Sequence, residues 1–361
     1  MARPEIRFNG FENEWSIKSI GEVTSDVFAG GDTDFSRLKS AGNFPVYANA
    51  LTDDGVVGYY DDYFRVTAPA VTVTGRGDVG FAKARFENFT PVVRLLVLIS
   101  QLDPHFLEQS INRAPAMLES TGVPQLTVPQ ISQYRISVPS TYEQQLIGRQ
   151  FASLEKISKF SKNRIIKLKS LKQSMLVKMF PQGGASVPEI RFEGFTDNWQ
   201  RKSLEMMMNL GSGRDYKHLS EGDVPVYGTG GYMCSVNSAL STSEDAVGIG
   251  RKGSINSPYL LRAPFWTVDT LFFAIPHKNV DLDFLYTVFQ TINWTTYDES
   301  TGVPSLSKDT IYSVEVYAPS PEEQAAIGSY FRQLDQLIEL EEAKLAKLTQ
   351  LKTAFLSKMF V

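Results

Sequence analysis

The sequence contains few of the residues that build disulfides or metal sites. Its single cysteine, Cys234, excludes an internal disulfide and any metal site made of several cysteines. Its three histidines, His105, His218 and His277, show none of the spacings that are typical of metal ligands. We therefore expect no metal ion in this chain.

Long hydrophobic runs and an excess of basic charge are also missing. No stretch approaches the roughly 20 apolar residues of a membrane-spanning helix, and the first residues lack the apolar run of a signal peptide. We expect a cytoplasmic chain without a membrane partner. The net charge of −4 gives no overall attraction to nucleic acid, so DNA binding requires local basic patches.

What the sequence does contain is a long internal repeat. PEIRFNGFENEW, which begins at Pro4, returns as PEIRFEGFTDNW at Pro188. STGVPQL at Ser120 returns as STGVPSL at Ser300. A motif of the form EQxxIGxxF follows at 143–151 and 323–331, and Lys-Met-Phe follows at 178–180 and 358–360. The same order of motifs in both halves indicates a tandem duplication of one large module.

The stretches between these motifs differ from each other. Residues 44–63 and 224–240 share little beyond Pro-Val-Tyr. Short runs of Val, Ile, Leu and Phe between turn residues predict strands, and residues 103–113 and 281–290 predict short helices. A constant frame around different middles is what two readers of different targets require. The alternative is an old duplication whose loops drifted without purpose.

Each half ends in a predicted helix of about 40 residues. Ser140 and Ser320 are each followed three residues later by glutamate, which predicts a capping box. The first helix is rich in lysine and arginine, which indicates either a solvated face or a neighbouring polyanion or acidic partner. Apolar spacing that alternates between three and four residues predicts a coiled-coil seam, which Leu171 and Leu351 would widen. The seam residues are Phe151, Leu154, Ile165, Leu168, Met175, Phe331, Leu334, Ile338, Leu345, Leu348 and Phe355.

These features predict a mixed α/β fold. We expect two α/β target-recognition domains in a pseudo-two-fold arrangement, separated by two long helices that pair antiparallel as a coiled coil. The alternative is that each helix packs only on its own domain. The expected boundaries are 1–139 for the first domain, 140–181 for the first helix, 182–319 for the second domain and 320–361 for the second helix.

No catalytic constellation is evident in the sequence. Residues 248–253 fit GxGxxG, but Ser254 to Pro258 cannot begin the helix that a dinucleotide site requires. The sequence has no GxxxxGK[ST] motif, no Asn/Asp-Pro-Pro-aromatic tetrapeptide of an amino-methyltransferase and no credible Ser-His-Asp set. We expect the chain to be non-catalytic.

Gly-Arg turns in each middle suggest DNA readers instead. Glycine lets the backbone approach a duplex, and arginine or lysine can bond a phosphate or a guanine edge. For any one residue, an ordinary surface or turn role is the alternative. The candidates are Tyr47, Asn49, Arg76, Lys83, Arg85, Arg214, Lys217, Tyr227, Thr229, Arg251, Lys252, Ser254 and Asn256.

The combination of PEIRFxGFxxxW, Pro-Val-Tyr, GRKG, STGVPxL and EQxxIGxxF resembles the specificity subunit of type I restriction–modification systems, over essentially the whole chain. The resemblance implies a subunit that binds double-stranded DNA without activity of its own. It also implies two methyltransferase subunits as partners, to which restriction subunits can be added. S-adenosylmethionine and ATP are then expected on the partners and no cofactor in this chain.

The first half departs from the family pattern, because it has GRGD at 75–78 in place of GRKG. This departure favours Arg251 over Arg76 as a DNA contact. Two different middles on a rigid helical spacer predict a bipartite, asymmetric DNA site with half-sites at a fixed distance. Two rival hypotheses are a coiled-coil scaffold without a DNA role and a nucleotide-dependent enzyme.

Overall fold

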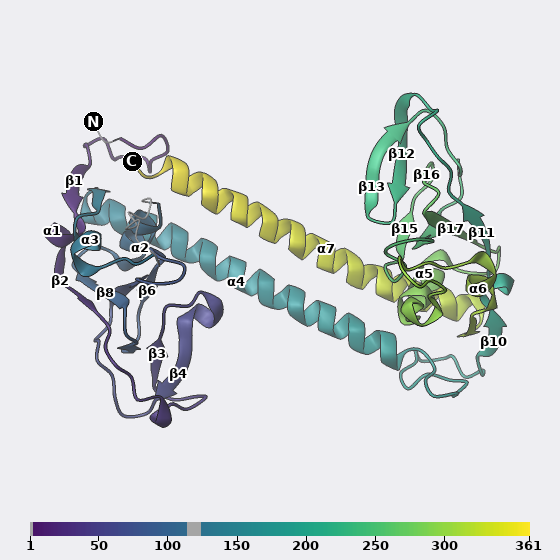
Figure 1. Ribbon diagram of the computed structural model, residues 1–361, viewed down its shortest axis with the longest axis horizontal. Helices are drawn as coiled ribbons and strands as arrows, with labels where there is room; N and C mark the ends of the chain where they lie inside the picture. Colours follow the sequence, from purple (N-terminus) through teal and green to yellow (C-terminus); the bar gives the residue numbers. More distant parts are fainter. Residues whose placement is uncertain (1–2, 114–123) are drawn as a thin grey trace. The chain divides into compact units, whose positions relative to one another are not determined.

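The computed structural model describes residues 3–113 and 124–361. The chain divides into two compact units: unit 1 comprises residues 1–162 and 343–361, and unit 2 comprises residues 163–342. Each unit therefore contains one globular part together with a segment of both long helices (Figure 1). The beginning of the first STGVPxL motif, residues 120–123, lies outside the described residues.

Unit 1 is a mixed α/β structure built on three small sheets. An antiparallel four-stranded sheet has the order β2-β8-β5-β6, a three-stranded sheet the order β4-β3-β7, and β1 pairs with β9. In the three-stranded sheet β3 runs antiparallel to β4 and parallel to β7. The strands are β1 (Ser16–Ser19), β2 (Thr24–Ala29), β3 (Phe44–Tyr47), β4 (Val56–Tyr60), β5 (Ala70–Thr74), β6 (Ala82–Arg85), β7 (Thr90–Pro91), β8 (Leu95–Ser100) and β9 (Arg135–Val138).

Unit 2 repeats this architecture strand for strand. Its sheets have the orders β11-β17-β14-β15, β13-β12-β16 and β10-β18, and β12 again runs antiparallel to β13 and parallel to β16. The strands are β10 (Gln200–Ser203), β11 (Met208–Ser212), β12 (Glu221–Gly228), β13 (Gly231–Val236), β14 (Ala246–Gly250), β15 (Tyr259–Leu261), β16 (Trp266–Thr267), β17 (Leu271–Pro276) and β18 (Glu315–Ala318). The predicted mixed α/β class is confirmed.

Each unit also contains short helices. The predicted helices at 103–113 and 281–290 are α2 (Pro104–Arg113) and α5 (Leu282–Thr291). Leu107 and Ile111 of α2 pack on the four-stranded sheet, while Phe106 joins a cluster with the long helices. The remaining short helices are α1 (Ile20–Val23), α3 (Val128–Ser132), α6 (Lys308–Ser313) and the 3-10 turns η1 (Phe35–Arg37), η2 (Thr52–Gly55), η3 (Leu204–Met206) and η4 (Trp294–Tyr297).

The two long helices are α4 (Thr141–Lys178) and α7 (Pro321–Lys358), and their segments pair antiparallel in each unit. In unit 1 the ring of Phe151 contacts Phe355 and Phe360. In unit 2 Arg164 pairs with Glu341 and Lys172 with Asp335, and Phe180, just after α4, contacts Phe331, so residue numbers fall on α7 as they rise on α4. Lys169 also pairs with Glu342. The predicted antiparallel pairing is therefore present.

Most of the predicted seam is buried. Phe151, Leu154, Ile165, Phe331, Leu334 and Ile338 are at most 9 % exposed. Leu168, Met175, Leu345, Leu348 and Phe355 are half-buried. Leu171 and Leu351 were expected to widen the stripe, but this prediction is wrong, because about two fifths of each is exposed. Leu176, which lies outside the predicted seam, is buried.

The basic character of α4 has a local explanation in unit 2. Three of its cations pair with carboxylates of α7 at N–O distances of 2.5–3.2 Å. Opposite charge on the two helices thus complements the apolar seam, as it does at the flanks of coiled coils. In unit 1 Lys159 pairs instead with Asp54, at the β3–β4 turn.

The repeated motifs form the same frame in each unit. Trp15, Phe106, Phe151 and Phe360 make an aromatic cluster in unit 1, and Trp199, Phe284, Phe331 and Phe180 make its counterpart in unit 2. These residues come from PEIRFxGFxxxW, the short helix, EQxxIGxxF and Lys-Met-Phe, in that order. The backbone N–H of Ile6 also donates to Lys358, as that of Ile190 does to Lys178. The motifs that identify the repeat therefore build its core.

The predicted capping box is only half present. The hydroxyl of Ser140 accepts the N–H of Glu143, as that of Ser320 does for Glu323, at 3.4 Å. The carboxylate of Glu143 does not return to the cap. It is buried and bonds both Nε and Nη2 of Arg7 instead, so the arginine of PEIRF outcompetes the local partner.

Candidate nucleic-acid interface

In unit 2 three loops converge at the end of β14. The N–H of Arg251 donates to Thr270 in the β16–β17 turn, and that of Leu306 donates to Arg251. The N–H of Gly253 donates to Pro304 at 2.8 Å, so the GRKG turn is bonded to the STGVPSL loop. We call the residues at this junction turn cluster 2. They are Thr229, Arg251, Lys252, Gly253, Asp269 and Thr270.

The STGVPSL loop has its own anchor. A carboxylate oxygen of Asp298 accepts the N–H groups of both Ser300 and Ser305 at 2.9 Å. These bonds hold the pKa of Asp298 below its ordinary value. The loop that supports Arg251 and Lys252 is therefore fixed by an ionised aspartate.

Unit 1 has the corresponding junction at the end of β5. The N–H of Leu126 donates to Gly75, and Gly75 in turn donates to the side-chain oxygen of Asn49 at 2.8 Å. The amide nitrogen of Asn49 donates to Val93 in the β7–β8 turn at 3.2 Å. We call these residues turn cluster 1. It comprises Asn49, Gly75, Arg76, Gly77, Val93 and Arg94, and all but Gly75 line an open hollow of about 600 Å³.

The hydrogen bonds also align the two clusters. Val92 donates to Tyr47 and Leu95 to Val92 in unit 1, while Val268 donates to Tyr227 and Leu271 to Val268 in unit 2. Arg94 therefore corresponds to Thr270, Val93 to Asp269 and Asn49 to Thr229. Leu126 bonds Gly75 as Leu306 bonds Arg251, and Gly77 and Gly253 both have φ in the left-handed region.

This register corrects the comparison of GRGD with GRKG. Arg76 corresponds to Lys252, and Gly75 occupies the place of Arg251. The departure of GRGD from the family pattern is therefore no argument against Arg76 as a candidate DNA contact. What unit 1 lacks is a side chain at the position of Arg251.

Several predicted residues of unit 2 are exposed in or near turn cluster 2. Arg251, Lys252 and Ser254 are exposed, and the guanidinium of Arg251 lies 5.7 Å from the ring centroid of Phe272. Arg251 and Lys252 line an open hollow of about 500 Å³ together with Asp269, Thr270 and Glu299. The hollow mixes cations with carboxylates, which suits selective hydrogen bonding better than general attraction to phosphate.

The other predicted residues of unit 2 have varied positions. Arg214 and Lys217 are exposed in the loop between β11 and β12. Tyr227 is half-buried between Tyr232 and Tyr259, and Thr229 is half-buried opposite Gly253. The side chain of Asn256 accepts the N–H of Trp294 at 2.8 Å, which gives it a structural bond.

In unit 1 two predicted readers are held inside the fold. Tyr47 is 4 % exposed and its hydroxyl donates to Glu87 at 2.7 Å. Arg85 is 8 % exposed, lies 3.7 Å above the Tyr47 ring and donates from Nε to Thr72. Burial lowers the pKa of Arg85 and raises that of Tyr47. The expectation that these two side chains reach a DNA groove is wrong in this structure.

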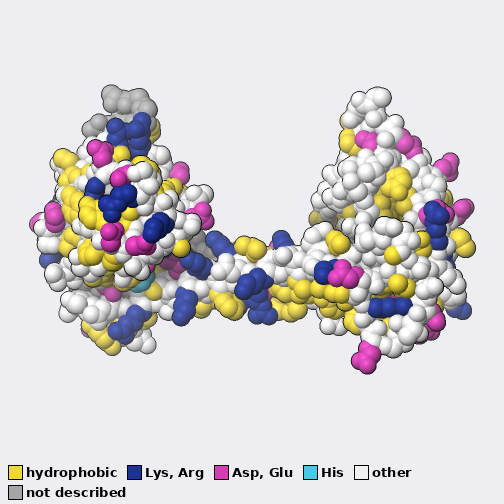
Figure 2. Space-filling model, turned by 90° about the horizontal axis from the view of Figure 1, so that it is seen from below, with side chains coloured by type: hydrophobic (Ala, Val, Ile, Leu, Met, Phe, Trp, Pro, Cys, Tyr) yellow, Lys and Arg dark blue, Asp and Glu magenta, His cyan; other side chains and the backbone are white. Residues whose placement is uncertain are grey.

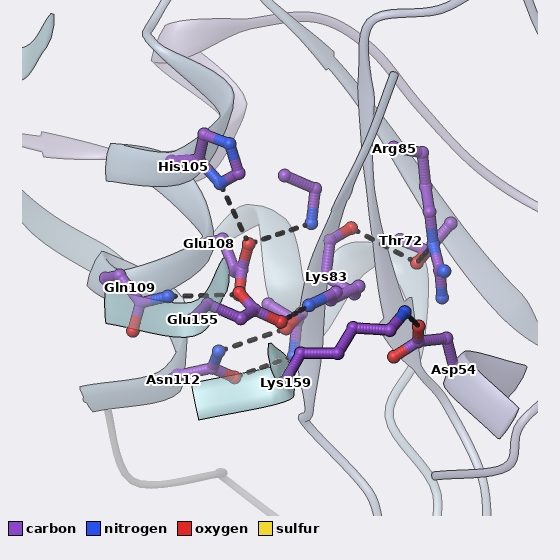
Figure 3. A network of polar contacts seen from close by, with 12 residues as sticks. Asp54, Thr72, Lys83, Arg85, His105, Glu108, Gln109, Asn112, Glu155 and Lys159 are labelled. Atoms are coloured by element: carbon purple, nitrogen blue, oxygen red, sulfur yellow. Dashed lines mark hydrogen bonds and ion pairs between the residues drawn. The ribbon is translucent and has the colours of Figure 1, made fainter. Parts of the chain in front are cut away.

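Lys83 belongs to a network that joins the β6 strand to α4 (Figure 3). Its ammonium pairs with Glu155, and Lys159 one turn later pairs with Asp54 at 3.2 Å. Glu108 of α2 accepts the N–H of Ala84, and Asn112 bonds both backbone groups of Ala82. These contacts hold the sheet of unit 1 against the helices, so Lys83 has a positioning role.

Sequence reasoning missed Arg94. The run VVRLLVLI predicts one continuous strand, but β8 begins only at Leu95 and Arg94 adopts a left-handed backbone with φ +70. The signal in the sequence that could have identified Arg94 was a charged residue inside an apolar run. Asp269 and Thr270 were missed for the same reason, because they precede the apolar strand β17.

Figure 2 shows the charged side chains on one face. On this face basic and acidic side chains are mixed over the globular part of each unit, and mainly basic side chains lie along the long helices. Within residues 3–113 and 124–361, no group of three or more His, Cys, Asp or Glu is placed to hold a metal ion. None of the helices in those residues is long and apolar enough to cross a membrane.

Comparison with known proteins gives a consistent result. The family model of the type I restriction modification DNA specificity domain matches residues 12–170 and 196–350. Two putative type I specificity subunits of Mycoplasma pneumoniae are 26 % and 28 % identical over 140 and 149 residues. These alignments cover 37 % and 40 % of this chain, and 38 % and 44 % of the relatives.

Solved structures agree at the level of the fold. The S subunit of a type I restriction–modification system from M. genitalium matches with a TM-score of 0.80 and 18 % identity, over 99 % of both chains. A chain from a structure on the assembly and conformational transition of the type I R-M system matches with a TM-score of 0.50 and 15 % identity, over 96 % of this chain and 97 % of that one. Because the specificity-domain model matches both halves of the sequence, the chain belongs to the type I restriction–modification DNA specificity family.

Proposed function

We propose that this chain is the non-catalytic DNA-reading subunit of a type I restriction–modification complex, and that it binds a bipartite, asymmetric site in double-stranded DNA. One observation carries the proposal. Turn clusters 1 and 2 share three backbone bonds, made by Leu126, Val92 and Leu95 in unit 1 and by Leu306, Val268 and Leu271 in unit 2, yet their side chains differ at every aligned position except the shared glycine. A retained frame with different side chains is what two readers of different half-sites require.

The long helices are proposed to set the distance between the half-sites. Both α4 and α7 contribute residues to both units, so each helix is a continuous connection between the two readers. The paired seam and its ion pairs stiffen the segments in each unit.

Methyltransferase subunits are proposed to dock on the outer faces of the helices. Phe160 in unit 1 and Ile166 and Leu340 in unit 2 are about three fifths exposed or more. Exposed apolar side chains along the helices are visible in Figure 2. Exposed apolar side chains that form a contiguous patch mark interaction sites. The partners would supply S-adenosylmethionine, the pocket for the flipped adenine and part of the phosphate contacts, and restriction subunits would bring ATP.

Sequencing of modified bases tests the proposal. Cells that carry this chain with its methyltransferase partner should methylate adenine in one bipartite motif, and cells without the chain should not. Replacing residues 20–119 with the corresponding stretch of another family member should change one half of the motif only. A change in both halves, or methylation that does not depend on the chain, contradicts the proposal.

A coiled-coil scaffold without a DNA role remains the second candidate, because most of the repeated motifs build the frame and not the surface. A titration of labelled duplex into the methyltransferase separates the two. Under the proposal, sequence-dependent binding appears only when this chain is present. A scaffold would leave the binding isotherm unchanged.

A further inference from the structure

We infer that Arg76 and Arg94 read guanine in the half-site bound by unit 1, an inference that rests on the proposed function. The two arginines belong to separate turns, after β5 and before β8, that meet in turn cluster 1. Both are exposed and both line the same hollow of about 600 Å³.

Both guanidinium groups are available to a ligand. Among the described residues, no hydrogen bond or ion pair engages the side chain of either Arg76 or Arg94. Some other arginines of unit 1 are engaged: Arg7 bonds Glu143, Arg37 bonds Asp62 and Arg85 bonds Thr72. The planar fork of a free arginine matches the O6 and N7 acceptors of guanine in the major groove.

The two turns are also held rigidly. The side chain of Asn49 accepts the N–H of Gly75 and donates to the carbonyl of Val93, so a single amide ties both turns together. A Cβ at Gly75 would lie 2.3 Å from the carbonyl oxygen of Arg94, which shows how closely the turns approach. These two bonds fix the orientation of the Asn49 side chain, which gives it a structural role in turn cluster 1.

The backbone of Arg94 is strained in a way that favours a functional role. Its φ of +70 lies in the left-handed region, which residues with a Cβ rarely adopt. The turn is stabilised by the bond from the N–H of Leu95 to Val92. Strain of this kind persists where the surrounding structure imposes it, and it is concentrated at functional sites.

Comparison of the two clusters favours base reading over phosphate contact. Phosphates are the same in every sequence, so a phosphate contact has no reason to differ between the two units. Yet Arg94 corresponds to Thr270, and its neighbour Val93 corresponds to Asp269. An aspartate at that position would repel phosphate, whereas a carboxylate can accept from cytosine N4. Positions that change in this way within a constant frame behave as determinants of specificity.

The first test uses the methylome of the complete system. The swap of residues 20–119 identifies the half-site of unit 1, which should contain guanine on one or both strands. Arg94→Ala and Arg76→Ala should each relax the motif at a guanine of that half-site and leave the other half unchanged. Arg135→Ala is the matched control, because Arg135 is exposed in unit 1 but lies on β9, in another sheet.

The second test distinguishes base from phosphate by binding of the purified complex to duplexes. Replacing the guanine with 7-deazaguanine removes the N7 acceptor and should weaken wild-type binding by roughly 10- to 100-fold. Arg94→Ala or Arg76→Ala should abolish that difference for its own guanine. Arg94→Lys should retain part of it.

Three results would overturn the inference: a unit 1 half-site without guanine, wild-type binding that ignores 7-deazaguanine, or variants that weaken binding equally on all sequences. In each case the wild-type chain would still direct methylation to a bipartite motif. Failure of the proposed function gives a different result, because the wild-type chain would then confer no sequence-dependent methylation.

Discussion

The guanidinium of Arg7 forms two hydrogen bonds with the carboxylate of Glu143, at 2.7 and 2.8 Å, across 136 residues of sequence. Arg191 forms the same pair with Glu323 at 2.6 and 2.7 Å. The side chains of the two glutamates are each 1 % exposed. In each unit this ion pair joins the PEIRF motif to the first turn of a long helix. The pairing explains why the arginine and the glutamate recur together in the repeated motifs.

We predict that Arg7→Ala destabilises unit 1 by about 3–5 kcal/mol, because it leaves the carboxylate of Glu143 buried and unpaired. Hydrogen exchange measured by mass spectrometry should show lost protection around 141–152 and none around 321–332. Arg191→Ala should give the reverse pattern. Arg201→Ala is the control, because the Arg201–Glu315 pair is exposed and should contribute at most about 1 kcal/mol. Equal effects of all three substitutions would contradict this assignment.

Gly148 and Gly328 occupy positions in the long helices where there is no room for a side chain. A Cβ at Gly148 would lie 2.0 Å from the carboxylate of Asp103, and one at Gly328 would lie 2.7 Å from the backbone nitrogen of Phe284. Asp103 cannot easily move, because it caps α2 by accepting the N–H of Phe106. The glycines therefore let the short helices approach the long ones.

Gly148→Ala and Gly328→Ala should each lower the free energy of unfolding by about 1–3 kcal/mol, because overpacking outweighs the helix propensity of alanine. Gly328→Ala should cost more, since it meets backbone as well as side chain. Chemical denaturation measures the difference. Ser170→Ala, at an exposed helical position, is the control and should change stability by less than about 0.5 kcal/mol. Stabilisation by either glycine substitution would refute the steric explanation.

Much of the frame could be predicted from the sequence. The seam was predictable because burial on a helix follows the spacing of apolar residues, and Phe151 and Ile338 are buried as the spacing requires. The partner of Glu143 was not predictable, because the serine three residues earlier offers a local solution while Arg7 is distant in sequence. A bidentate buried pair is stronger than a capping bond, but only the fold brings it together.

The turn clusters were less predictable for a different reason. Tyr47 and Arg85 have the residue types of a DNA reader, and nothing in the sequence distinguishes a stacked, buried pair from an exposed one. Arg94 was hidden in an apolar run, because the left-handed turn that exposes it depends on the bond from Leu95 to Val92. The alignment of Arg76 with Lys252 likewise required the backbone bonds of both units.

Ser161 is a polar interruption of the seam whose removal should stabilise the protein. Its side chain is fully buried, and its hydroxyl has no hydrogen-bond partner in the part of the chain that the structure describes. Ser161→Ala should raise the free energy of unfolding by about 1–2 kcal/mol, from relief of an unpaired hydroxyl and from helix propensity. Ser170→Ala is again the control, because at an exposed position the substitution changes only the helix propensity. An unchanged melting temperature for Ser161→Ala would show that the hydroxyl is satisfied in solution.

Asp298 should make turn cluster 2 sensitive to acid. Its pKa in the folded chain is lowered by the N–H groups of Ser305 and Ser300, so its stabilising effect is complete above the unfolded value of about 4. That effect is lost as the pH falls through the lower folded value. Hydrogen exchange in residues 299–306 should therefore increase below about pH 4 beyond its intrinsic pH dependence. Asp298→Asn should show weaker protection at pH 7 and no such step; a step that persists in this variant would implicate another group.

The final prediction concerns the helices as a spacer. Seven residues added to α4 after Lys162 and seven added to α7 after Glu342 preserve the heptad register, and therefore the antiparallel seam, in both units. Each insertion lengthens its helix by about 10 Å, which corresponds to about three base pairs of B-DNA. The methylome of this variant should retain both half-sites and increase the gap between them by about three base pairs. A seven-residue insertion in α4 alone is the control, because it leaves the seam mismatched and should abolish methylation. A variant with both insertions that still methylates the original motif would show that something other than the paired helices sets the distance.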